Sequence, residues 1–317
     1  MAATKGFRTV FKSPGVINWF PGHMNSARNA MKAQLNSVDV IIEVRDARIP
    51  WSSANPLLDG IGNHKPRLVV LNKSDLSNSN MKERVEYRFN EQNIDCMFTS
   101  VIKGKHIRNI LQWCTENGKS QFQSTAGTAH PQTPSSRILM HVLPGTVVMV
   151  VGVPNVGKSS MINAFRGIST SLKLAKGKKK AVVGPTPGVT LRTDIIKVNE
   201  APAIYVMDTP GVMLPSVPSP SVGLKLALTG AIKDEVVGEE LIADYMLFLL
   251  NQMNSTQYVK ALGLAGPTDD IDELMSSITK QSGGVGKPEE RQTLLAAQYL
   301  LKEFRRGSFG RFTLDPL

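Results

Sequence analysis

The chain has 317 residues, of which 41% are apolar and 20% charged; this excludes a disordered polyelectrolyte and leaves length for two folded domains. No apolar run approaches a membrane span, and two cysteines without paired spacing (Cys96, Cys114) exclude a disulfide framework, so we expect reduced thiols. Residues 225–317 carry 10 Lys or Arg against 13 Asp or Glu, whereas the rest of the chain carries 27 against 13. The excess of positive charge before residue 225 favours a polyanionic partner such as RNA; the alternative is that this charge only serves solubility.

The start of the chain is basic, because the first acidic residue is Asp39. Residues 1–13 would place Phe7, Val10 and Phe11 on one face of a helix and basic residues elsewhere, a pattern typical of a mitochondrial import helix. The same residues suit a basic arm that contacts RNA, and the pattern does not choose between the two.

Strand and helix patterns alternate over the first half of the chain. Strands are expected at 38–43, 68–71 and 96–99, and helices at 26–36, 81–92 and 107–116. The strands are short, continuous apolar runs, as in a parallel sheet that is covered on both faces, so we predict an α/β architecture.

The second half changes character after a boundary rich in Pro and Ser. A polar linker (117–136) is followed by strands at 146–151 and 203–207, a helix at 160–165 and the boundary segment 213–223. Helices are expected beyond it at 224–229, 236–252, 256–262, 270–281 and 289–304. We therefore predict a basic arm and helix over 1–37, an α/β domain over 38–220 and a small all-helical domain over 221–317.

Residues 152–159 (GVPNVGKS) satisfy the phosphate-loop pattern G-x-x-x-x-G-K-[ST] between a predicted strand and a predicted helix. Two glycines allow a tight turn, so that backbone N–H groups at a helix N-terminus can cradle phosphates. Lys158 would supply the charge and Ser159 a ligand for Mg²⁺. The predicted phosphate-binding residues are Asn155, Val156, Gly157, Lys158, Ser159, Ser160 and, further along the chain, Gly211.

Asn72, Lys73, Ser74 and Asp75 form an NKxD motif at the end of a predicted strand. The Asp75 carboxylate can accept from the ring N–H and the exocyclic amine of guanine, a pair of donors that adenine lacks. Asn72 would hold the loop and Lys73 would pack over the ring. Ser100, after the next strand, is the predicted backbone contact to the guanine oxygen. The expected ligand is therefore GTP or GDP.

A DTPG motif at 208–211 supplies the Mg²⁺ side of the site. Asp208 would hold Mg²⁺ through water, and the N–H of Gly211 would meet the γ-phosphate. The first switch is expected within residues 185–190, with Thr190 as the Mg²⁺ ligand and Thr186 as the competing choice. Residue 212 is Val, which cannot orient a water molecule as Gln does in Ras-like enzymes, so we expect slow intrinsic turnover.

Along this chain, the guanine-reading NKxD motif (residues 72–75, here called the base reader) comes first, the phosphate loop second and the switches last. In ordinary small GTPases the phosphate loop comes first. We therefore predict a circularly permuted P-loop GTPase domain. Residues 173–180 (KLAKGKKK) carry five lysines between the phosphate loop and the first switch, which suits contact with RNA phosphates; a solvated loop is the alternative.

The permuted order, residues 18–24 (NWFPGHM), 45–50 (RDARIP) and 224–230 (LKLALTG) together resemble the circularly permuted ribosome-assembly GTPases, typified by bacterial ribosome biogenesis GTPase A. Within that family, the basic start and the overall sequence are most similar to the mitochondrial branch, which acts on the large ribosomal subunit. The resemblance implies a GTPase that supports mitochondrial translation, is stimulated by the subunit, and uses Mg²⁺ and K⁺.

The resemblance also implies roles for single residues. His23 would serve catalysis in place of the missing Gln, although by itself it equally suits a structural or RNA-contacting residue. Asn155 would bind K⁺, the alternative being an Asn that stabilises the loop. The helical domain would dock on ribosomal RNA, helped by exposed basic residues such as Arg305, Arg306 and Arg311.

The expected partner is the large subunit and its rRNA, not DNA, and the expected state is a monomer in the mitochondrial matrix. Peripheral association with the inner membrane is a possible accessory property. The alternatives are a GTP-dependent scaffold with negligible turnover and a ribosome-assembly GTPase outside mitochondria.

Overall fold

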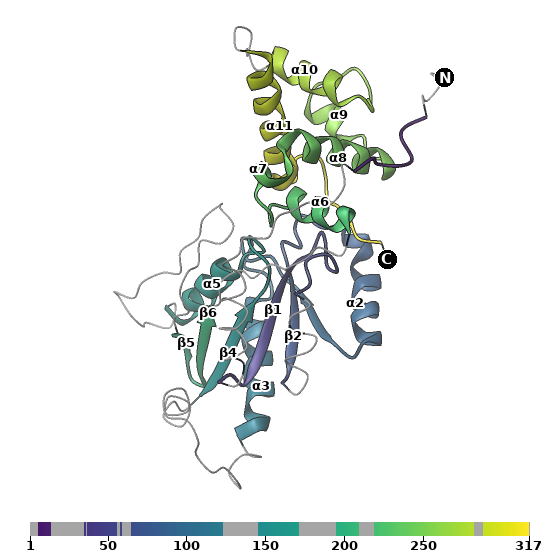
Figure 1. Cartoon of the computed structure of the whole chain (residues 1–317). Helices are drawn as coiled ribbons and strands as arrows, with labels where there is room; N and C mark the ends of the chain where they lie inside the picture. Colours follow the sequence, from purple (N-terminus) through teal and green to yellow (C-terminus); the bar gives the residue numbers. More distant parts are fainter. Residues whose placement is uncertain are drawn as a thin grey trace.

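The structure is a computed structural model, and it describes residues 6–13, 35, 37–55, 58, 65–122, 145–170, 195–208, 219–281 and 288–316. An α/β domain and a helical domain lie one above the other (Figure 1). The described part of the chain contains no helix that is both long and apolar enough to cross a membrane.

The α/β domain is built on a six-stranded sheet with the order β3-β2-β1-β4-β6-β5. The strands are β1 (Val40–Asp46), β2 (Arg67–Asn72), β3 (Asp95–Phe98), β4 (Thr146–Val151), β5 (Ile195–Glu200) and β6 (Ala203–Asp208). All neighbouring strands are parallel except β5 and β6, which form an antiparallel pair. The carboxyl ends of β1, β2, β4 and β6 therefore meet at one edge of the sheet, where loops that are distant in sequence lie together.

Helices cover both faces of the sheet, as the apolar strand runs predict. Among the described residues, the helices of this domain include η1 (Ser79–Met81), α2 (Lys82–Glu91), α3 (Ile107–Phe122) and α5 (Lys158–Thr170). Alternate strand residues such as Ile42 and Val148 belong to the same core cluster as residues of α3 and α5, whereas Val69 and Leu71 pack with α2. Period-two alternation of side chains along each strand explains this division.

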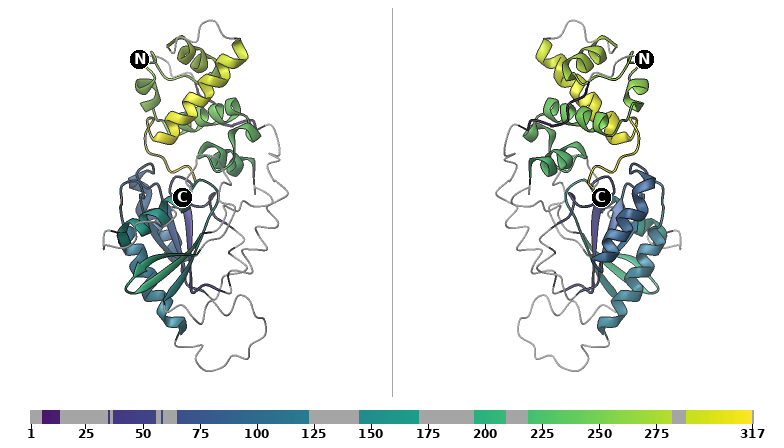
Figure 2. Two further views of the ribbon diagram at one scale, coloured as in Figure 1. Left: turned by 90° about the vertical axis from the view of Figure 1, so that its left-hand side faces the viewer. Right: turned by 90° about the vertical axis from the view of Figure 1, so that its right-hand side faces the viewer.

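The helical domain contains α6 (Pro220–Leu228), α7 (Asp234–Val237), α8 (Glu239–Gln252), α9 (Gln257–Ala261), α10 (Ile271–Gln281) and α11 (Glu289–Arg306). The two long helices, α8 and α11, pack against each other, and α6 lies next to the α/β domain (Figures 1 and 2). The buried residues of α6 and α8 belong to the same apolar cluster as those of α3 and α5. The hydrophobic core is therefore continuous across the domain junction.

The first and last described segments pack on domains that are remote from them in sequence. Residues 6–13 are not helical, and Arg8 pairs with Asp244 of α8 at 2.6 Å and with Asp269 at 3.1 Å. At the other end, Asp315 accepts from the backbone N–H groups of Trp51 and Ser52, each at 2.8 Å. The predicted domain limits at residues 38 and 221 stay predictions, but the first described segment lies on the helical domain and the last returns to the α/β domain.

Several predicted elements need correction. The linker expected from residue 117 is helical up to Phe122, because Gly118 lets α3 approach β4: a Cβ there would lie 2.3 Å from Thr146. The boundary segment ends earlier than expected, since Pro220 begins α6 behind the Ser219 cap. The single helix predicted over 236–252 breaks at Gly238, whose φ of 95° ends α7.

Two further differences concern the edge strand β5 and Arg305. The sequence prediction omitted β5, which is only half-buried at the sheet edge and so lacks a strong apolar run. Arg305 was expected to be an exposed RNA contact, yet it is half-buried and pairs with Asp234 at 2.6 Å. It also donates to the carbonyls of Ala227 and Leu228, where it completes the end of α6.

Candidate nucleotide-binding site

The base-reading motif begins where β2 ends, at Asn72, which is 3% exposed. Its Nδ2 donates to the carbonyl of Val156 in the phosphate loop at 2.8 Å. Its Oδ1 accepts from the backbone N–H of Val101 at 3.1 Å. One side chain thus joins the base reader, the phosphate loop and the loop after β3, three segments that the sheet topology places at the same edge.

The other residues of the motif are also held from neighbouring loops. Lys73 has a left-handed backbone (φ 60°), and its ammonium lies 3.0 Å from Asp46 at the end of β1. The N–H of Ser74 donates to the carbonyl of Thr99 at 3.0 Å. The loop is therefore fixed from β1 and from the end of β3.

Asp75 accepts a hydrogen bond from the hydroxyl of Ser100 at 2.7 Å. The structure thus brings these two predicted guanine-binding residues together through side chains, whereas the sequence suggested a backbone role for Ser100. Val101, whose N–H fixes Asn72, was not predicted. Its contribution comes from the backbone, so no residue-type signal marks it.

The glycines of the phosphate loop are required by close approach of the backbone. Gly152 has φ 152°, and a Cβ there would lie 2.3 Å from the carbonyl oxygen of Val44. Gly157 has φ 99°, and a Cβ there would lie 2.4 Å from Nδ2 of Asn72. Real Cβ atoms essentially never approach so closely, so either substitution would move the loop or its neighbour.

Lys158 begins α5, and its ammonium donates back to the carbonyls of Gly152 at 3.1 Å and Val153 at 3.0 Å. Ser159 and Ser160 follow in the first turn of the helix. A cation held over a turn of backbone amides at a helix N-terminus is suited to bind the phosphates of a nucleotide.

Asn155 connects the phosphate loop to the helical domain. It adopts a left-handed backbone (φ 58°), and its Nδ2 donates to the carbonyl of Gly230, just beyond α6, at 2.8 Å. The sequence did not predict this contact, because the chain separates the two residues by 75 positions.

Two of the residues predicted to ligate Mg²⁺ lie in the described part of the chain, Ser159 in the first turn of α5 and Asp208 at the end of β6. Asp208 is the last residue of β6 and pairs in parallel register with Val150 of β4, the strand that leads into the phosphate loop and Ser159. A hydroxyl and a carboxylate are the ligand types that Mg²⁺ prefers. The predicted residues His23, Thr186, Thr190, Gly211 and Val212, and residues 173–180, lie outside the described residues.

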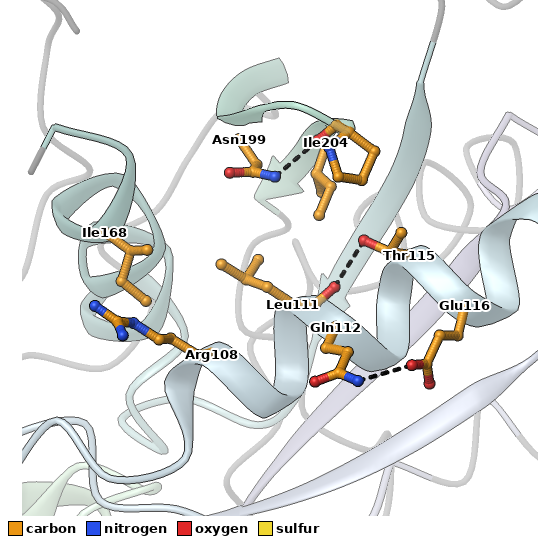
Figure 3. A pocket seen from close by; sticks show the side chains of 9 residues that line it. Arg108, Leu111, Gln112, Thr115, Glu116, Ile168, Asn199 and Ile204 are labelled. Carbon is orange, nitrogen blue, oxygen red and sulfur yellow. Dashed lines mark hydrogen bonds between the residues drawn. The ribbon is translucent and has the colours of Figure 1, made fainter. Parts of the chain in front are cut away.

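A separate hollow of about 480 Å³ lies between α3, α5 and the turn that joins β5 to β6 (Figure 3). Its lining includes Arg108, Gln112, Ile168 and Asn199. Ile168 belongs to the last turns of α5, whereas the phosphate loop precedes the first turn. The hollow is therefore at the other end of this helix from the nucleotide site.

The comparisons with known proteins agree with this geometry. The family described as "50S ribosome-binding GTPase" matches residues 147–283, a range that begins in β4 and leaves the base reader before it. The chain is 38% identical to mitochondrial ribosome-associated GTPase 1 of Xenopus tropicalis, over 95% of this chain and 94% of the relative. It is 34% identical to ribosome biogenesis GTPase A of Bacillus cereus, over 95% and 94%.

The chain belongs to the ribosome-associated GTPase family. As a member of this family it is a GTPase, and the family implies guanine nucleotide and Mg²⁺ as its ligands. The mitochondrial names of relatives, including that of Mus musculus at 37% identity over 95% of this chain and 90% of the relative, support a mitochondrial location.

Among solved structures, the GNP-bound structure of YlqF from T. maritima is similar with a TM-score of 0.57 and 20% identity, over 92% of this chain and 97% of that one. At this identity the likeness shows the fold, and it confirms the prediction of a permuted GTPase domain followed by a helical domain.

Proposed function

We propose that this GTPase is a molecular switch in the assembly of the large subunit of the mitochondrial ribosome. The observation that carries the proposal is the hydrogen bond from Asn72 to the Val156 carbonyl, which unites the base reader and the phosphate loop across 84 residues. This contact supports a guanine-nucleotide site that combines the base reader and the phosphate loop in the permuted order. Full-length similarity to proteins named for ribosomes supports the partner.

The basic part of the chain supports an RNA partner within the subunit. The residues before 225 carry 27 Lys or Arg against 13 Asp or Glu, a net charge of +14, and residues 173–180 contribute five lysines next to the first switch. In this proposal these lysines contact rRNA phosphates, GTP orders the switches, and hydrolysis releases the protein.

Ser159, Thr190 and Asp208 would hold Mg²⁺, which supplies charge stabilisation at the phosphates. Gly211 would bind the γ-phosphate through its N–H, and His23 would assist the attacking water. Asn155, whose Nδ2 donates to the Gly230 carbonyl, would bind K⁺. The protein would act as a monomer.

The test is GTP hydrolysis by the full chain, with and without purified mitochondrial large subunits, in K⁺ and in Na⁺. Stimulation by subunits supports the proposed function, and stimulation only in K⁺ supports the role of Asn155. If large subunits fail to stimulate in either salt, while the protein still binds GTP, the ribosomal role is refuted.

A second candidate is a GTP-dependent scaffold with negligible turnover, which Val212 favours because its side chain cannot orient water. Single-turnover hydrolysis on large subunits separates the two, since a scaffold would release no phosphate above background. Peripheral binding to the matrix side of the inner membrane would be an accessory property, tested by flotation with liposomes that contain or lack anionic lipid.

A further inference from the structure

Residues 45–50 (RDARIP) contact both the base reader and the helical domain, and beyond the ion pair of Asp46 with Lys73 the functional site described above gives them no role. Asp46 ends β1 and stands opposite Asn72 in the parallel register of β1 and β2. The next residue, Ala47, donates its N–H to the carbonyl of Asn72 at 2.8 Å. The segment therefore runs directly beside the first residue of the base-reading motif.

The carboxylate of Asp46 is almost fully buried, with 1% exposure, and it holds two cations. Oδ1 accepts from the backbone N–H of Arg48 at 3.0 Å and from its Nε at 2.9 Å. Oδ2 accepts from Nη2 of Arg48 at 2.8 Å and lies 3.0 Å from the ammonium of Lys73. Burial by itself would raise the pKa of Asp46, but Arg48 and Lys73 outweigh it and hold the pKa well below its usual range.

Lys73 is the residue whose aliphatic stem would pack over the guanine ring. A lysine stem has four rotatable bonds, and ordering them on binding costs entropy. Because the ammonium is already fixed to Asp46 and the backbone is fixed in the left-handed region, the stem is confined before the base arrives. Such preorganisation increases affinity without adding any contact to the ligand.

Arg48 extends the same network into the helical domain. Its Nη2 reaches the carbonyl of Thr229 at 3.5 Å, and its guanidinium lies 6.0 Å from the ring centre of Phe304 in α11. Its own carbonyl accepts from the N–H of Leu314 at 2.7 Å. The side chain is 2% exposed, and Nη1 has no hydrogen-bond partner among the described residues. A buried guanidinium with this arrangement can move little without shifting Asp46 or the α6 end.

We propose that Asp46 is a positioning residue for guanine-nucleotide binding, which holds Lys73 over the base, and that Arg48 links this hold to the docking of the helical domain. The proposal rests on the assignment of residues 72–75 as the base reader. It predicts that nucleotide affinity and the placement of the C-terminal segment at Leu314 depend on each other, as linkage requires.

The first experiment measures the affinity of the full chain for fluorescent mant-GDP. Asp46→Asn keeps the shape of the side chain but removes its charge, so affinity should fall by about tenfold, comparable to the loss of one charge-assisted contact. In a Lys73→Met background the same change should weaken binding by less than about twofold, because the interaction it supports is already gone.

Glu43→Gln is the matched control for this cycle. Glu43 lies on the same strand, is fully buried, and pairs with an arginine two residues away, Arg45, at 2.8 Å, but it does not contact the base reader. It should lower stability yet leave mant-GDP affinity within about twofold of wild type. If Asp46→Asn does not fold, Arg48→Lys replaces it and should also weaken binding. Equal effects of the Asp46 and Glu43 variants, or additivity with Lys73→Met, would overturn the positioning role.

Hydrogen–deuterium exchange tests the link to the helical domain. GDP should slow exchange in residues 312–316 of wild type, and this slowing should disappear in Asp46→Asn at saturating GDP. Protection confined to residues 152–159 in wild type would refute the link. Failure of wild type to bind any guanine nucleotide would instead refute the proposed function, so the two failures are distinguishable.

Discussion

Asn72→Ala should damage both stability and nucleotide binding, because a single side chain joins three loops. The substitution removes the 2.8 Å bond to the Val156 carbonyl and the 3.1 Å bond from the Val101 N–H. Asn72 is 3% exposed, so water reaches these backbone groups poorly and each is left partly unsatisfied. At about 1–3 kcal/mol for each of the two stranded buried groups, the free energy of unfolding should fall by about 2–6 kcal/mol. Urea unfolding gives this value, and mant-GDP titration gives the accompanying loss of affinity.

Two further variants sharpen the test of Asn72. Asn72→Asp keeps the acceptor for Val101 but sets a carboxylate oxygen against the Val156 carbonyl, so it should weaken GDP binding at least as much as the alanine. Asn199→Ala is the control, because its amide makes a similar 2.8 Å bond to the Pro202 carbonyl at an exposed turn. That variant should cost less than about 1 kcal/mol and leave GDP affinity unchanged. The reasoning is refuted if Asn72→Ala behaves like Asn199→Ala.

Three other predictions address the base reader, the N-terminal segment and the thiols. Asp75→Asn should shift preference from GTP toward xanthosine triphosphate in competition titrations, because the new amide can donate where the carboxylate only accepts; an unchanged preference for GTP would contradict the base-reader assignment. Arg8→Ala should lower the free energy of unfolding by about 1–2 kcal/mol, since it removes the partly exposed hydrogen bonds of the guanidinium to Asp244 and Asp269. Lys12→Ala on the same segment is the control and should change this free energy by less than about 0.5 kcal/mol. Equal effects of the two variants would argue against docking of the segment on the helical domain. Burial raises the pKa of Cys96 to about 11 and that of Cys114 to about 12, whereas an unfolded thiol has a pKa near 9.0. As pH rises, the thiols of the unfolded chain therefore lose their protons first, and the free energy of unfolding should fall above about pH 9. Urea midpoints measured from pH 8 to 10 check this, and a midpoint that rises over that range would contradict it.

The strands and long helices of the α/β domain follow from local patterns. β2 and β4 were predicted within a residue of their limits, because a buried parallel strand needs an unbroken apolar run and these runs are bounded by polar or turn residues. Errors arose where tertiary contacts override local signals. Gly118 continues α3 because Thr146 packs against it, and β5 forms because β6 offers it a hydrogen-bonding edge.

The nucleotide motifs were visible in the sequence because their chemistry depends on residue type. Glycine is required where a Cβ would lie 2.3 Å from the Val44 carbonyl, and the predicted role of Asp75 in reading guanine would require a carboxylate. Such requirements fix the same residue types at the same spacing in every site that uses this chemistry. The spacing also showed the permuted order, which the sheet topology then accommodates.

The sequence by itself determined the class of fold and the guanine ligand, and it predicted the residues that would bind this ligand. Only the tertiary structure decided what the predicted residues contact: Asn72 contacts Val156, Asn155 contacts Gly230, and Lys73 contacts Asp46. It also placed Arg8 in ion pairs on the helical domain, where the sequence suggested a helix for import or an RNA contact. The physical reason is that residue type fixes what a group can bind, whereas the partner depends on which distant segments the sheet order and domain docking bring within hydrogen-bond reach.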